Sequence, residues 1–139
     1  MQTRYTPLVK LKKSTMDKSE RAVQKASADL NSASVALQLS YNSLEDISEP
    51  SSGSMSDFMA SRTLLSSQRG LIEHNKKWVH FASHQVANAK EEFKKDMIEH
   101  EKFKYLELQE IKKFLKAQKI KEEKELDEIA LMTYKIKEK

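Results

Sequence analysis

The sequence predicts an all-α protein: an antiparallel two-helix coiled-coil hairpin with a longer second helix overhanging at the C-terminus. The 139 residues include only two glycines and two prolines, too few for the turns of a sheet-rich fold. Large apolar residues recur at seven-residue intervals on both sides of one turn-rich stretch. A third of the residues are charged, which is typical of long helices. We therefore expect a single elongated coiled-coil domain over residues 1–139.

The first helix is predicted over about residues 7–48. Thr6 can cap its N-terminus, and Pro7 suits the first turn because the amide hydrogen it lacks has no helical partner there. Pro50 disfavours helical backbone at the residue before it, so the helix should end near Ser48.

A turn is predicted over about residues 49–57, where Pro, Ser and Gly cluster. Ser54 followed three residues later by Asp57 resembles a capping box, the pattern in which two residues satisfy each other's free amides at a helix start. The second helix should run from there over about residues 58–136.

Both predicted helices carry a heptad pattern, which indicates that they pack as a left-handed coiled coil. In the first helix a row of large residues runs beside a row of mostly small ones: Met16, Val23, Leu30, Leu37 and Leu44, beside Ser19, Ala26, Ala33, Ser40 and Ile47. In the second helix the large row is Phe58, Leu65, Ile72, Val79, Val86 and Phe93, with Ala82 and Ala89 as small companions. A short connection between two such helices predicts an antiparallel hairpin.

The predicted helices differ in length, at about 60 Å and about 120 Å. If the hairpin closes at residues 50–54, Pro7 lies opposite residue 97, and residues beyond about 100 have no partner within the chain. The apolar stripe of the second helix also changes phase, resuming after Phe93 on Leu108, Leu115, Ile129 and Ile136. An isolated helix is marginal in water, so this segment should dock on another molecule.

The sequence lacks the residues that several kinds of site require. The chain has no cysteine for a disulfide or a thiolate–metal site and no glycine-rich phosphate loop, and a two-helix hairpin has no enclosed pocket. We therefore expect a non-enzyme without cofactor or metal. His80 and His84 share a helix face but lack the glutamate of a zinc protease motif, so they are interpreted as ordinary surface histidines.

Neither a membrane nor a nucleic acid is an expected direct partner. The sequence has no apolar run that could span a bilayer or act as a signal peptide. Trp78, Phe81 and Phe93 could stack on bases, but their surroundings are not strongly basic, so we favour hairpin core with one interfacial aromatic. The basic run from Lys10 to Lys25 is either a solvated helix face or a contact for an acidic partner.

Two segments carry a resemblance to a known family. The N-terminus reads Tyr5-x-x-Leu8-x-x-Leu11 followed by basic residues, and the C-terminal part contains Lys124-Glu125-Leu126-Asp127-Glu128-Ile129-Ala130. Together with the helical hairpin, these segments resemble the FliJ family of bacterial flagellar type III protein export, over nearly the whole chain.

The resemblance implies a soluble stalk that enters the ring of the hexameric flagellar export ATPase, contacts the export-gate membrane protein and binds empty export chaperones. It implies a cytoplasmic location, peripheral to the membrane at the flagellar base. The ATPase-docking residues implied are Lys10, Lys13, Arg21, Leu126, Asp127, Glu128 and Ile129. The residues implied to face the export gate and chaperones are Gln38, Tyr41, Phe58 and Leu65.

Two other functions remain open at this point. A generic coiled-coil scaffold or dimerisation protein would share the heptads, and the stalk of a virulence type III secretion system would share the architecture.

Overall fold

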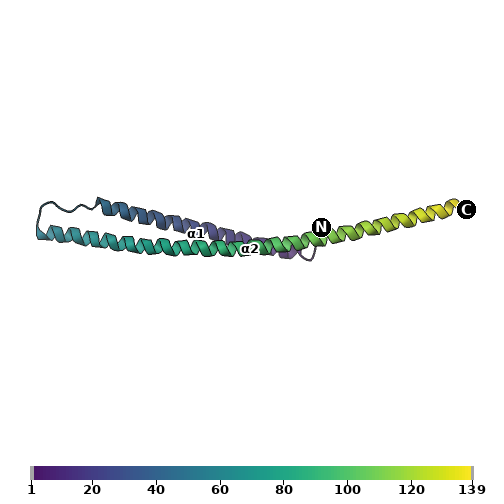
Figure 1. Cartoon of the computed structure of the whole chain (residues 1–139), viewed down its shortest axis with the longest axis horizontal. Coiled ribbons are helices and arrows are strands. Elements are labelled where there is room, and N and C mark those ends of the chain that lie inside the picture. The colour runs from purple at the N-terminus through teal and green to yellow at the C-terminus, as the bar shows by residue number, and fades with distance from the viewer. Residues whose placement is uncertain (1, 139) are drawn as a thin grey trace. The chain divides into compact units, whose positions relative to one another are not determined.

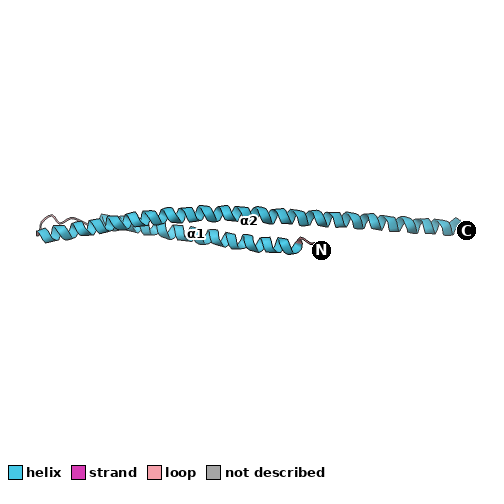
Figure 2. Ribbon diagram, turned by 90° about the horizontal axis from the view of Figure 1, so that it is seen from below, coloured by secondary structure: helices cyan, strands magenta, loops and turns pink. Residues whose placement is uncertain are grey.

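The computed structural model describes residues 2–138, and two helices account for nearly all of them (Figure 1). Helix α1 spans Thr6–Asp46 and helix α2 spans Met55–Glu138. No strand occurs within residues 2–138, and Figure 2 shows only helices and loops. The two helices run antiparallel and pack against each other, which confirms the predicted all-α helical hairpin.

The chain divides into two compact units, to each of which both helices contribute. We call Asp17–Lys95 the hairpin unit, and Met1–Met16 with Asp96–Lys139 the terminal unit. The expectation of one domain remains a prediction, and the two units are described separately.

The hairpin unit is held by the predicted heptad rows. Every member of the two rows from Ser19 to Ile47 is buried or half-buried. The same holds for the members of the α2 rows from Leu65 to Phe93. Ala33 is fully buried, and Ile72 and Ala82 are nearly so. The small residues of α1 let the helix backbones approach, and the larger residues fill the space between them.

A polar cluster interrupts this apolar seam near its middle. The Asn75 side-chain amide donates hydrogen bonds to the Ala36 carbonyl oxygen at 3.3 Å and to the Ser40 hydroxyl. The Gln68 side-chain amide donates to the Ser40 carbonyl oxygen at 2.8 Å. Because a polar residue in a coiled-coil seam is satisfied in only one alignment, these bonds fix the register of the two helices.

Residues 47–54 connect the helices, and the predicted capping box closes the start of α2. The Ser54 amide donates to Asp57 Oδ2 at 3.2 Å, and the Asp57 amide donates to the Ser54 hydroxyl at 3.3 Å. Gly53 adopts a φ of +146°, and a Cβ there would lie 2.8 Å from Asp57 Oδ2. Glycine is therefore required for the chain to enter this cap.

The connection is extended, and it shifts the pairing of the helices. Figure 1 shows α2 starting beyond the end of α1, so that the first turns of α2 have no helix opposite them. Residues 55–60 are all exposed, and Ser61 is the first buried residue of α2. Phe58 is 39% exposed, so its predicted place in the seam is wrong.

The terminal unit pairs the start of α1 with a part of α2 further along the sequence than predicted. Lys12 Nζ lies 3.8 Å from Glu99 Oε2, and an Arg4 guanidinium nitrogen lies 3.8 Å from Glu110 Oε2. Pro7 therefore lies opposite the stretch between these two acids, and its predicted placement opposite residue 97 is wrong. The pairing in the hairpin unit is shifted by a comparable number of residues, as the bond from Asn75 to Ala36 shows. The shift arises because the helices do not close symmetrically around residues 50–54.

The packed seam of the terminal unit keeps the seven-residue spacing, and the predicted apolar stripe with its shifted phase lies outside this seam. After Phe93 the row continues through His100, which is buried, and Glu107, which is half-buried. Leu108 is 49% exposed and lies outside the seam. Polar residues at the seam positions conceal the continuing pattern.

The last part of α2 is exposed: Lys113 and Phe114 share a hollow with residues 2–4, and beyond Phe114 the helix has no packing partner among residues 2–138. Ile111 is the last half-buried residue, and residues 112–137 are all exposed. We call residues 112–138 the C-terminal overhang. It begins after Ile111 rather than near residue 100, because the start of α1 packs further along α2 than predicted.

Candidate partner-docking surfaces

The end of the C-terminal overhang exposes large apolar side chains around most of the helix circumference. Five residues between positions 129 and 136 are 59–74% exposed: Ile129, Leu131, Met132, Tyr134 and Ile136. Successive residues of an α-helix are turned by about 100°, so these five side chains cover the circumference except for one sector of about 140°, which holds the small Ala130 and Thr133. A helix that is apolar all round is normally buried on all sides.

The remainder of the C-terminal overhang is divided into two blocks of opposite charge. Residues 112–121 contain five lysines and no acidic residue. Residues 122–128 contain five acidic residues and one lysine. Leu115 and Leu126, one in each block, are 54% and 65% exposed.

The residues expected to dock on the ATPase are all exposed, but they do not form one cluster. In the terminal unit, Leu126, Asp127, Glu128 and Ile129 lie on the C-terminal overhang, whereas Lys10 and Lys13 flank Lys12, which pairs with Glu99. At 1.5 Å per residue, the lysines are separated from Leu126 by about 40 Å along α2. Arg21 is exposed within the hairpin unit. A partner that contacts both the lysines and Leu126 in the terminal unit must therefore span about 40 Å.

The residues expected to face the export gate and chaperones differ in accessibility. Gln38 is exposed and donates a hydrogen bond to Asn42, and Phe58 is exposed near the start of α2. Tyr41 is 37% exposed, and its ring centroid lies 6.0 Å from Lys76 Nζ. Leu65 is half-buried in the seam, so packing already accounts for it.

Lys76 is held between two groups that favour its charged form. Its ammonium lies 3.2 Å from Glu73 Oε1, and the Glu73 hydrogen bond, followed by the one with Tyr41, raises the pKa of Lys76.

Sequence reasoning missed a second apolar row on α2. Leu64, Leu71 and Trp78 are 58%, 47% and 40% exposed, and Phe81, expected near the core, is 62% exposed. Each of the first three directly precedes a seam residue, namely Leu65, Ile72 and Val79. Their own seven-residue spacing was a detectable signal, but the stronger seam row concealed it.

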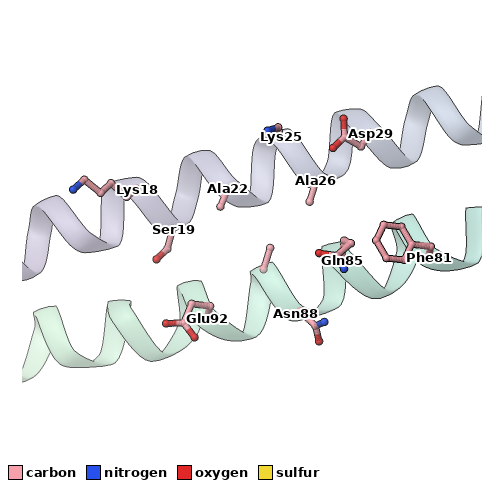
Figure 3. A pocket seen from close by; sticks show the side chains of 11 residues that line it. Lys18, Ser19, Ala22, Lys25, Ala26, Asp29, Phe81, Gln85, Asn88 and Glu92 are labelled. Atoms are coloured by element: carbon pink, nitrogen blue, oxygen red, sulfur yellow. The ribbon is translucent and has the colours of Figure 1, made fainter. Parts of the chain in front are cut away.

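An open groove lies between α1 and α2 in the hairpin unit (Figure 3). Small side chains form part of its lining, and its edges carry charged and aromatic residues, including Ala22, Ala26, Ala89, Lys18, Phe81 and Glu92.

Two further observations concern metal and membrane binding. The His80 and His84 rings meet edge to face with centroids 4.9 Å apart, but no group of three metal-binding side chains occurs within residues 2–138. In the same part of the chain, neither helix contains an apolar stretch long enough to cross a membrane.

A helical hairpin that leaves an apolar helix end unpaired has the architecture of a docking protein, which acts through contacts with partners. The family model described as flagellar FliJ protein matches residues 1–139, so the chain belongs to the FliJ family. This finding confirms the resemblance and assigns the chain a role related to flagellar protein export, in a family of non-enzymatic components. No curated protein and no solved structure matches the chain.

Proposed function

We propose that this protein is the stalk of the flagellar type III export apparatus and inserts its C-terminal overhang into the ring of the hexameric export ATPase. Family membership supports the general role. The observation that supports ring insertion is the apolar circumference of residues 129–136. A partner helix covers one stripe of a helix, whereas the interior of a ring can cover all sides.

The basic start of α1 supplies a second contact in this proposal. Lys10 and Lys13 are exposed in the same unit as the overhang and can meet acidic loops at the ring entrance. Arg21, in the hairpin unit, extends the basic surface along the sequence. Exposed charges of this kind mainly speed association, and salt screens them over about 8 Å at physiological ionic strength.

The hairpin unit carries the remaining proposed contacts. Gln38, Tyr41 and Phe58 are accessible to the export gate and to empty chaperones, and the exposed Leu64 and Leu71 enlarge the available apolar surface. These partners place the protein in the cytoplasm, peripheral to the membrane at the base of the flagellum. The role requires binding and no catalysis by this chain.

The test measures hydrolysis by the export ATPase as the full-length protein is added. Ile129 and Leu131 lie about 200° apart around the helix, on nearly opposite sides. If a ring surrounds the overhang, Ile129→Asp and Leu131→Asp should both reduce stimulation about tenfold or more, because each buries an unpaired charge. Gln118→Asp, a change at an exposed polar position, serves as the control.

The same experiment separates the stalk from a coiled-coil scaffold. A generic scaffold has no role in the ATPase ring, so the full-length protein should leave hydrolysis unchanged, with or without either aspartate substitution. Removing residues 112–139 should abolish stimulation while circular dichroism still reports a folded hairpin. Wild-type stimulation by the truncated protein would contradict ring insertion.

A further inference from the structure

We propose that the C-terminal overhangs of two copies of this chain pair with each other in antiparallel orientation and form a reversible dimer. The pairing is inferred from charges and apolar residues in the terminal unit and does not depend on the proposed function. One consequence of the pairing does rest on the proposed function. A paired overhang cannot enter an ATPase ring, so the second copy and the ring compete for the same surface.

The two charged blocks make the overhang complementary to itself in one orientation. Its first block, residues 112–121, has five lysines, and its second block, residues 122–128, has five acidic residues. Two parallel overhangs in register would place lysines beside lysines. Two antiparallel overhangs that cross near residue 121 place each basic block beside an acidic one, and two-fold symmetry repeats every contact.

One antiparallel register also matches the apolar residues. When Leu115 of one copy lies opposite Leu126 of the other, Lys119 lies opposite Glu122 in the same stripe. On the flank of that stripe, Lys116 comes beside Glu123. All six side chains are exposed in the structure. In coiled coils, polar residues in the seam specify the register at a cost in stability, and charged pairs beside it select the partner and the orientation.

The same register gives the apolar end of each overhang a place to bind. Ile136 of one copy comes opposite Tyr105 of the other, at a hollow on α2 that Leu108 and Ile111 also line. Tyr105 and Leu108 are 61% and 49% exposed. Glu101, Glu107 and Lys104 also line this hollow, so its net charge is negative where the partner's Lys135 and Lys137, which flank Ile136, would arrive.

The expected dimer is weak, because Lys119 and Glu122 occupy stripe positions where a stable coiled coil has apolar residues. Its formation should depend on protein concentration, and it should weaken as salt screens the charged pairs.

Two charge-reversal variants of the full chain test this pairing by sedimentation equilibrium. The first is Lys116→Glu with Lys119→Glu, and the second is Glu122→Lys with Glu123→Lys. Each variant alone places like charges opposite each other, so its dissociation constant should rise at least tenfold. An equimolar mixture should restore association, because every reversed charge then meets its opposite. A wild-type chain that stays monomeric at its highest soluble concentration would overturn the proposal, as would a mixture that stays monomeric.

Disulfide trapping tests the orientation, since the chain has no cysteine of its own. Leu115→Cys mixed with Leu126→Cys should give a disulfide-linked pair faster than either variant alone. Ala117→Cys, on the opposite side of the helix from Leu115, is the control for random collision. Equally fast linking by Leu115→Cys alone would indicate parallel pairing and refute the register. No ATPase is used, so these results are independent of the test of stalk function.

Discussion

The hairpin unit and the terminal unit use the same seven-residue spacing but fill it with different residues. In the hairpin unit the seam buries Ala33, Ile72 and Ala82, and its central polar residue, Asn75, is hydrogen-bonded across the helices. In the terminal unit the only buried residue among those described is His100. Because fewer residues are buried in the terminal unit, we expect it to be less stable than the hairpin unit.

The lower stability expected for the terminal unit has a physical cause. His100 Nδ1 is buried without a hydrogen-bond partner among the described residues, and Glu101 Oε1, at 3.9 Å, is too distant to supply one. Glu107 Oε2 is also buried without a partner in that part of the chain. Each such group costs about 1–3 kcal/mol. The start of α1 can therefore separate from α2 more easily than the rest of the hairpin.

The largest effect is expected from Leu30→Asp in the hairpin unit. Leu30 belongs to the half-buried row of α1, so the substitution places an unpaired carboxylate in the seam. The free energy of unfolding should fall by several kcal/mol. Urea denaturation monitored by circular dichroism measures it, with Asn31→Asp at the adjacent exposed position as the control. A fall no larger than that of the control would place Leu30 outside the seam.

A gain of about 1–2 kcal/mol is expected from His100→Leu in the terminal unit. The substitution removes a buried polar atom without a partner and supplies an apolar side chain to the seam. Hydrogen exchange should show stronger protection of amides 9–16 and no change at amides 25–40. His84→Leu, at an exposed position, controls for helix propensity. Unchanged protection of amides 9–16 would mean that the buried polar atom of His100 does not destabilise the seam of the terminal unit.

The smallest effect is expected from Asn75→Ala, at about 1 kcal/mol. The substitution removes the hydrogen bonds to Ala36 and Ser40, but Ser40 keeps its own bond to the Ala36 carbonyl oxygen. Asn88→Ala, which is exposed, is the matched control in a thermal unfolding measurement. A loss as large as that of Leu30→Asp would show that polar contacts, and not apolar packing, dominate the hairpin unit.

Periodicity predicted the fold because the hairpin seam is built from the residues that the heptad rule searches for. Leu30, Leu37 and Ile72 are large, apolar and regularly spaced, so they identify both helices and their packed faces. The register was mispredicted because the length and shape of a connection are not encoded in the pattern. An extended loop places Lys12 beside Glu99, an offset that no periodicity reveals.

Prediction of the docking surface was less complete, and for a related reason. The unpaired apolar end around Ile129 and Ile136 could be predicted because it lies beyond the length of α1. The seam positions of His100 and Glu107 could not, because polar residues carry no hydrophobic signal. The exposed Leu64 and Trp78 lie one position before a stronger row, which hides a second surface on the same helix.

The extended connection also sets the order in which the chain folds. Of the inter-helix hydrogen bonds described above, that of Gln68 to Ser40 lies nearest to the connection and spans 28 residues, and that of Asn75 to Ala36 spans 39. The entropy lost in closing a loop grows with its length. Pairing of the two helices should therefore begin beside residues 47–54 and proceed step by step away from them. During synthesis, α1 leaves the ribosome with its apolar rows uncovered until residues 61–95 follow. Pairing of Lys12 with Glu99 then comes late, because Glu99 is made after residues 61–95.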